Sequence, residues 1–214
     1  VNATIQNVME ELQRKDNRKI QMFQQRPGGN LKVAQQMLEK DQLESIREAI
    51  AITSEAEAFY KWNLLLKKQI NTMRMLLYYQ IREFDKVDEL IPQSMFFDVR
   101  SLAVKMVRMY KKDDPKLDAF YRKKAKKFKG DDLALLASLY SFVQLKRDNA
   151  EGALQTLIEA RKKTDSPVIA ANWEALANGK VKQYSNAALG DAWYSLYLEE
   201  PKVKQQRVRD SRPF

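Results

Sequence analysis

The stretch "LLYYQIREFDKVDELIP", residues 76–92, decides how the chain folds, because it forms either one helix or two short helices in a hairpin. Charged residues crowd its middle at "REFDK", and an apolar face restarts at Val87, Leu90 and Ile91 before Pro92. Proline stops a helix, since it lacks the amide donor and its ring clashes with the preceding turn. The pattern predicts a helical hairpin that turns near residue 84.

Comparable breaks occur at three later places, in residues 110–120, 145–154 and 177–189. The four centres are separated by roughly 30 to 35 residues, which is the period expected of paired-helix repeats. Second stops lie between these breaks, at "IPQS", "KGDD" and "TDSP". The order helix, turn, helix, stop is therefore repeated along the chain.

One repeat carries a family resemblance. The segment "LASLYSFVQLKRDNAEGALQTLIEARKKTDSP" has a small residue, Ser141, in its first helix, Ala153 at the close-packing position of its second helix, and Pro167 near its end. This segment resembles a tetratricopeptide repeat (TPR), and the resemblance extends over roughly residues 70–198. It implies a right-handed stack of helical hairpins with a concave surface that docks extended peptides or partner helices.

Helices are also predicted ahead of the repeats. One runs from about Ala3 to Gln24 and ends before "RPGGN", and another continues from Leu31 to Ile50 with apolar residues at helical spacing. The stretch "TSEAEAF" indicates a helix start, because Ser54 and Glu57 have capping-box spacing. A long helix with an apolar stripe from Phe59 to Ile81 is expected next.

The sequence thus predicts an all-α protein, a TPR-like α-solenoid of antiparallel helical hairpins with additional N-terminal helices. We expect N-terminal helices over 1–55, the repeat domain over 56–199, and a mobile basic tail over 200–214. Because the chain begins at Val1, we expect it to be a segment of a longer protein, with processing as the alternative. If membrane spans preceded Val1, a basic domain after them would fit retention on the cytoplasmic side. The longest uncharged stretch, Leu133 to Leu145, is too short to cross the roughly 30 Å of bilayer hydrocarbon.

The residue composition argues against most catalytic chemistry. The chain has no cysteine and no histidine, which removes thiolate nucleophiles, the commonest general base and the commonest metal ligand. Adjacent acids such as Asp113 and Asp114 stand beside predicted helix ends, where capping and the helix dipole explain them. We therefore predict that the protein is not an enzyme and has no cofactor, metal or small-molecule substrate.

A net charge of +10 suits an acidic protein, an anionic membrane surface or nucleic acid. The stretch "YRKKAKKFK", residues 121–129, carries six cations and no acid. We predict that its outer face contacts anionic surfaces through Arg122, Lys123, Lys126 and Lys127. Its aromatic residues have core spacing and are unsuited to base stacking, so nucleic acid is the less favoured partner.

The TPR resemblance implies a partner-binding set on the first helices of the repeats. This set consists of Tyr79, Arg108, Lys111, Lys112, Phe142 and Lys146. Such a mixed apolar and cationic strip suits an acidic or amphipathic protein segment, since apolar anchors supply affinity and cations supply steering.

We therefore expect a non-enzymatic scaffold for protein–protein interactions in a bacterial assembly. It would be cytoplasmic and tethered to the inner membrane by segments outside this chain. Two rivals stay open: a nucleic-acid-binding helical-repeat protein, and an enzyme that uses carboxylates or a lysine.

Overall fold

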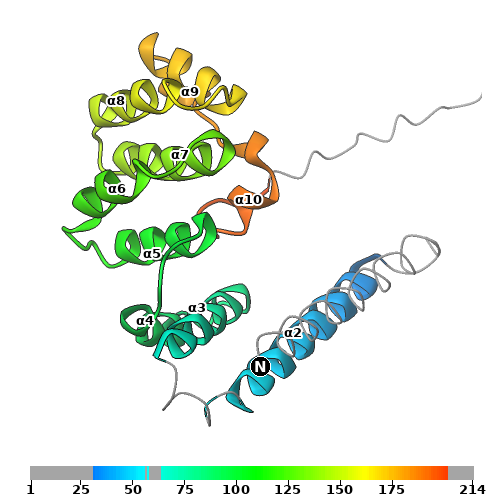
Figure 1. The fold of residues 1–214 in the computed structure, drawn as a ribbon. Helices are drawn as coiled ribbons and strands as arrows, with labels where there is room; N and C mark the ends of the chain where they lie inside the picture. The colour runs from blue at the N-terminus through cyan, green and yellow to red at the C-terminus, as the bar shows by residue number, and fades with distance from the viewer. Residues whose placement is uncertain (1–30, 56, 58–63, 202–214) are drawn as a thin grey trace, which may run out of the picture. The chain divides into compact units, whose positions relative to one another are not determined.

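The computed structural model describes residues 31–55, 57 and 64–201, and every regular element in these residues is a helix (Figure 1). The predicted all-α class is therefore confirmed for this part of the chain. The chain forms two compact units, which divide between Ser101 and Leu102. The predicted first helix, the "RPGGN" turn and the basic tail beyond Pro201 lie outside the described residues.

The first unit contains α2 (Leu31–Glu55), α3 (Leu64–Gln80), α4 (Phe84–Leu90) and the short 3₁₀ helix η2 (Ile91–Gln93). Leu66, Ile70 and Leu77 of α3 are buried, as the apolar stripe predicts, while Phe59 and Trp62 lie outside the described residues. The predicted helix start at Ser54 is wrong, because α2 continues to Glu55.

Arg74 of α3 explains why the polar residues near the end of α2 are not a helix cap. Its guanidinium donates to Thr53 Oγ1 at 2.6 Å and to Ser54 Oγ at 3.1 Å. It also pairs with Glu57 at 2.7 Å. These hydroxyl groups therefore help to bind α2 to α3.

The hairpin predicted at residues 76–92 is confirmed by α3 and α4, which pack against each other. The chain reverses at Arg82, whose φ of 59° lies in the left-handed region. The amide of Glu83 donates to Tyr78 O at 3.0 Å, and Val87 of α4 is fully buried.

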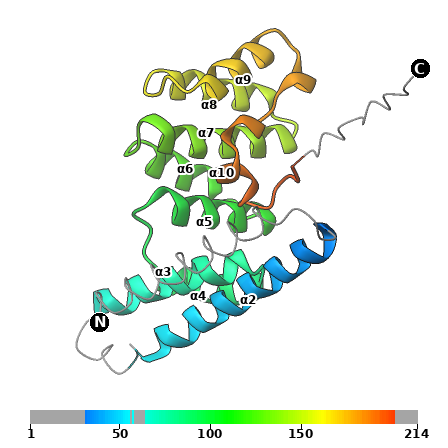
Figure 2. The same cartoon turned by 90° about the vertical axis from the view of Figure 1, so that its right-hand side faces the viewer.

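The second unit is a series of helices that follow one another along the chain (Figure 2). Its first helix, α5, begins at the end of the first unit. The helices are α5 (Val99–Lys111), α6 (Leu117–Ala125), α7 (Gly130–Lys146), α8 (Ala150–Arg161) and α9 (Pro167–Ala177), followed by η3 (Val181–Gln183), η4 (Ala187–Leu189) and α10 (Asp191–Tyr194). Helix α7 packs against α6, α8 and α9.

The same C-terminal cap closes α3, α5, α7 and α9. Each helix is followed by one left-handed residue: Arg82, Asp113, Asp148 or Gly179. The next residue's amide donates to the carbonyl five positions back, as in a Schellman motif. These bonds are Glu83 N to Tyr78 O (3.0 Å), Asp114 N to Met109 O (2.9 Å), Asn149 N to Gln144 O (2.9 Å) and Lys180 N to Ala175 O (2.8 Å). All four predicted breaks thus share one backbone geometry.

The core of the second unit is built around α7, in which every residue from Leu133 to Gln144 is buried. Small side chains let its neighbours approach closely. The cluster consists of Ala134, Ala137, Ala153, Leu157, Ala160, Ile169 and Leu176, from α7, α8 and α9. Alanines at these contacts permit tight packing, so even a modest increase in side-chain volume would strain this core.

The fourth predicted hairpin is wrong for the described residues, because no long second helix follows α9 as far as Pro201. Residues 184–200, which we call the covering segment, contain only η4 and the four-residue helix α10. The segment leaves the end of α9 and brings α10 beside α7 in both views (Figures 1 and 2). Instead of forming another hairpin, the chain therefore folds back over helices that it has already built.

We predict that Gly179→Ala lowers the free energy of unfolding by about 1 kcal/mol, because an alanine at a φ of 68° is strained. An added Cβ would meet no atom within 4 Å, so the loss would report backbone strain and not a clash. The matched control is Asp148→Gly, which places glycine at a φ of 57° and should cause no loss. Urea denaturation measures the free energy of unfolding of both variants. Equal values for Gly179→Ala and the unmodified chain would contradict the cap assignment.

Candidate partner-binding surface

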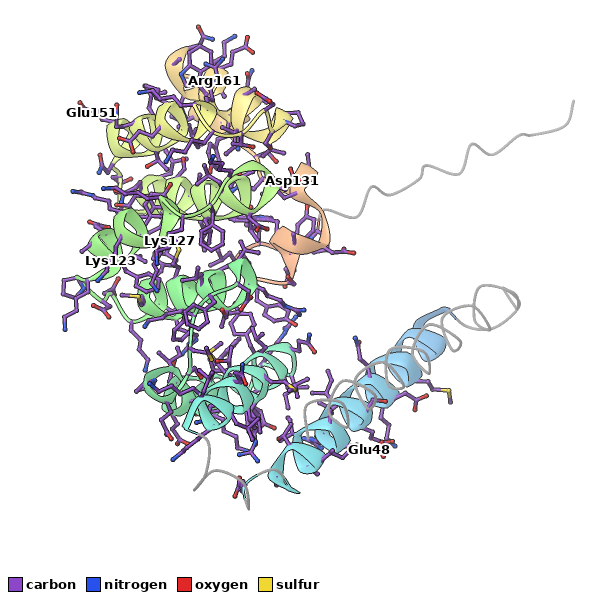
Figure 3. The ribbon with its side chains drawn as sticks, viewed as in Figure 1. Glu48, Lys123, Lys127, Asp131, Glu151 and Arg161 are labelled. Carbon is purple, nitrogen blue, oxygen red and sulfur yellow. The ribbon has the colours of Figure 1, made fainter. Side chains whose placement is uncertain are left out.

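The cations predicted to contact anionic surfaces lie on the exposed side of α6 and in the turn that follows it. Arg122, Lys123, Lys126 and Lys127 are all exposed, and Figure 3 labels Lys123 on the helix and Lys127 just beyond its end. Lysine and arginine near a helix C-terminus are favoured, because the helix dipole is negative there. We call these four residues the α6 cationic surface.

The opposite side of α6 is fixed to the second unit. Leu117, Tyr121 and Ala125 are buried, and the Tyr121 ring stacks on the Tyr140 ring of α7 with a centroid distance of 4.0 Å. Asp118 accepts from Arg147 at 3.2 Å and from Gln144 at 3.4 Å. The α6 cationic surface is therefore presented by a helix with firm contacts on its other side.

Further positive charge lies between α5 and α6. The Lys105 ammonium is 4.9 Å from the centre of the Phe120 ring. Burial, with the nearby Lys124 ammonium as the second cause, lowers the pKa of Lys105. Lys105 of α5 and Lys124 of α6 thus lie close enough to repel each other, an effect that Asp114 partly offsets.

Three residues of the predicted partner-binding set lie at the end of α5. Arg108 is half-buried, whereas Lys111 and Lys112 are exposed. The Lys111 ammonium is 5.8 Å from the centre of the Tyr110 ring. The two exposed lysines can therefore meet an anionic partner.

Tyr79, also in that set, lies in the first unit and is only 3% exposed. Its ring meets the Phe84 ring edge to face, with centroids 5.5 Å apart. The expectation that Tyr79 offers an open contact surface is corrected, because its side chain is part of the packing around the α3–α4 hairpin.

Phe142 and Lys146 lie together on α7, with the Lys146 ammonium 5.2 Å from the centre of the Phe142 ring. Lys146 is exposed, but Phe142 is only 6% exposed. The Trp193 ring of α10 meets Phe142 edge to face at a centroid distance of 5.2 Å. The expected open apolar face at Phe142 is therefore corrected: the chain's own covering segment occupies it.

A buried polar network holds the start of the covering segment to α7 and α9. The Tyr184 hydroxyl donates to Ser138 O at 3.0 Å. Asn172 of α9 donates from Nδ2 to Asn186 Oδ1 at 2.8 Å and accepts the Ser185 amide at 2.9 Å. Because Asn186 is fully buried, loss of these partners would leave polar groups unsatisfied in the interior.

Sequence reasoning did not identify Tyr184, Asn186 and Trp193, since it treated residues 177–189 as another interhelix turn. A signal was nevertheless present in α7. The uncharged run from Leu133 to Leu145 leaves no polar face for solvent. A helix that is apolar all round must be covered on every side.

Two negative findings concern the residues that the structure describes. None of their helices is long and apolar enough to cross a membrane. No group of three or more acidic residues among them is arranged to hold a metal ion.

Comparisons of the chain with protein-family models, with characterised proteins and with solved structures found no match.

Burial of the Tyr184 hydroxyl, partly offset by hydrogen bonds, raises its pKa from 10.0 to about 12. The folded state therefore holds this proton more tightly than the unfolded chain does. We predict that the free energy of unfolding is insensitive to this group below pH 10 and falls as the pH rises from 10 towards 12.

Denaturation of the Tyr184→Phe variant across this pH range tests the assignment. In Tyr184→Phe the free energy of unfolding should fall less steeply with rising pH than in the unmodified chain. Some decline should remain, because burial also raises the pKa values of Tyr121 and Tyr140. An unchanged slope in Tyr184→Phe would show that the hydroxyl is not held in the interior.

Proposed function

We propose that the protein is a non-enzymatic, TPR-like helical-repeat scaffold that binds an acidic segment of a protein partner through its second unit. The repeat assignment is supported by the shared cap at residues 82, 113, 148 and 179. Its spacing agrees with the roughly 34-residue period of TPR hairpins.

The observation that carries the binding proposal is the α6 cationic surface. Its four cations are exposed, while Leu117, Tyr121 and Ala125 fix the other side of the same helix. A fixed helix needs little ordering of its backbone when a partner binds, and its cations steer an acidic partner over a distance of about a Debye length. Lys111 and Lys112 at the end of α5 add positive charge to the same unit.

An acidic protein segment fits this surface better than single-stranded nucleic acid does. Sequence-tolerant binding of single strands uses aromatic rings on which bases stack. Tyr121 is buried against Tyr140, and Phe120 lies beneath the Lys105 ammonium. The rings of this helix are thus committed to internal contacts, which leaves charge as the main means of recognition.

We predict that Lys123→Glu/Lys127→Glu weakens binding of an acidic amphipathic peptide about tenfold at low salt, because two favourable charges become repulsive. The probe is a fluorescein-labelled synthetic helix with glutamates and leucine anchors, and fluorescence anisotropy measures its Kd. Both side chains are exposed, so circular dichroism should show an unchanged fold.

The matched control is Lys180→Glu/Lys182→Glu, which changes the net charge equally at exposed residues beyond α9. Equal losses in the two double variants would mean that net charge alone attracts the peptide. The same titration with duplex DNA and with vesicles containing phosphatidylglycerol separates the rivals. Tighter binding to either probe than to the peptide would overturn the proposed partner class.

A further inference from the structure

The α7 face that carries Phe142 and Lys146 holds a segment with the chemistry expected of the partner. Residues 191–200, "DAWYSLYLEE", contain three carboxylates and no cation in a chain whose net charge is +10. Trp193 is fully buried and Leu196 is 2% exposed. This stretch is thus an acidic segment with two apolar anchors.

The anchoring contact brings together three kinds of interaction. Trp193 meets Phe142 edge to face, and the Lys146 ammonium lies 5.2 Å from the same phenyl ring. The Trp193 indole N–H donates to Glu199 Oε2 at 2.7 Å, so a carboxylate is held beside the tryptophan. An aromatic anchor, a carboxylate and a neighbouring lysine form a recognition unit of the kind that concentrates binding energy.

The covering segment is attached in a way that permits release. Its backbone hydrogen bonds are local, as in Leu189 N to Asn186 O and Tyr197 N to Tyr194 O. Its contacts with α7 and α9 described above come from side chains, apart from the Ser185 amide, which donates to Asn172 Oδ1. Helices α7 and α9 can therefore keep their own backbone hydrogen bonds when this segment leaves.

One backbone conformation in the segment opposes its bound form. Tyr197 has a φ of 52°, which is unfavourable for a bulky residue. Such strain reduces the net free energy that holds the segment in place and favours local opening before the helices unfold.

We propose that residues 191–200 are an intramolecular occupant of a partner site on α7, and that an acidic partner segment with an aromatic anchor displaces them. This inference rests on the proposed scaffold function, because it specifies how the same unit admits its partner. The bound peptide would place its aromatic side chain against Phe142 and a carboxylate near Lys146. Competition from the resident segment would lower the apparent affinity for that partner.

The test uses the full chain and a fluorescein-labelled peptide of residues 189–201, "LGDAWYSLYLEEP". Trp193→Ala in the protein should raise the peptide's affinity about tenfold over the unmodified chain, because the weakened resident segment competes less. Adding Phe142→Ala to that variant should abolish the gain. A control peptide with Trp193→Ala should bind neither protein.

Hydrogen exchange of the unmodified protein gives an independent readout. Amides of residues 191–197 should exchange at least tenfold faster than those of α7, since their opening leaves the helices folded. Exchange of both regions at one rate, or failure of the peptide to bind a folded Trp193→Ala variant, would overturn the proposal and make the segment a fixed part of the core. The Lys123 and Lys127 variants test the scaffold proposal separately, so the two proposals can fail independently.

Discussion

The second unit depends on the need to cover α7. From Leu133 to Gln144 every residue of this helix is buried, and none of them is charged. Leaving two of its large apolar side chains in water would cost on the order of 3–6 kcal/mol. That is a large part of the roughly 5–15 kcal/mol by which most domains are stable. Helices α6, α8 and α9 supply part of the cover, and Trp193 of the covering segment supplies more over Phe142.

The sequence predicted the parts of the fold that depend on local patterns. Each break combines polar residues with a restart of an apolar face, and three of the four breaks lead into the expected second helix. The same reasoning failed after α9, because the polarity of residues 177–189 resembles that of a turn whether or not a helix follows. It also failed at Ser54, which lies inside α2 and whose hydroxyl bonds to Arg74 twenty residues away. Long-range partners of this kind leave no local pattern.

Most charged residues of the candidate site were predicted correctly as exposed, whereas its aromatic residues were not. Charged side chains seek water, so the exposure of Lys123 and Lys127 followed from their type and their place on a helix with one apolar face. Aromatic side chains at Tyr79 and Phe142 could serve a partner or the core, and helical spacing does not distinguish the two. The uniform apolarity of α7 was the missing evidence, since it requires a cover that a stack of hairpins alone does not supply.

The order of elements along the chain has a mechanical consequence. The covering segment comes last among the described residues, beyond Gly179, and its Trp193 contact follows the network at Tyr184 and Asn186 along the chain. Tension applied through Pro201 would therefore reach the Trp193 contact first and peel the segment from α7 before any load arrived at the long helices. An attachment downstream would make this end of the molecule responsive to pulling, whereas force from the opposite end would meet helical hairpins that hold by packing along their length.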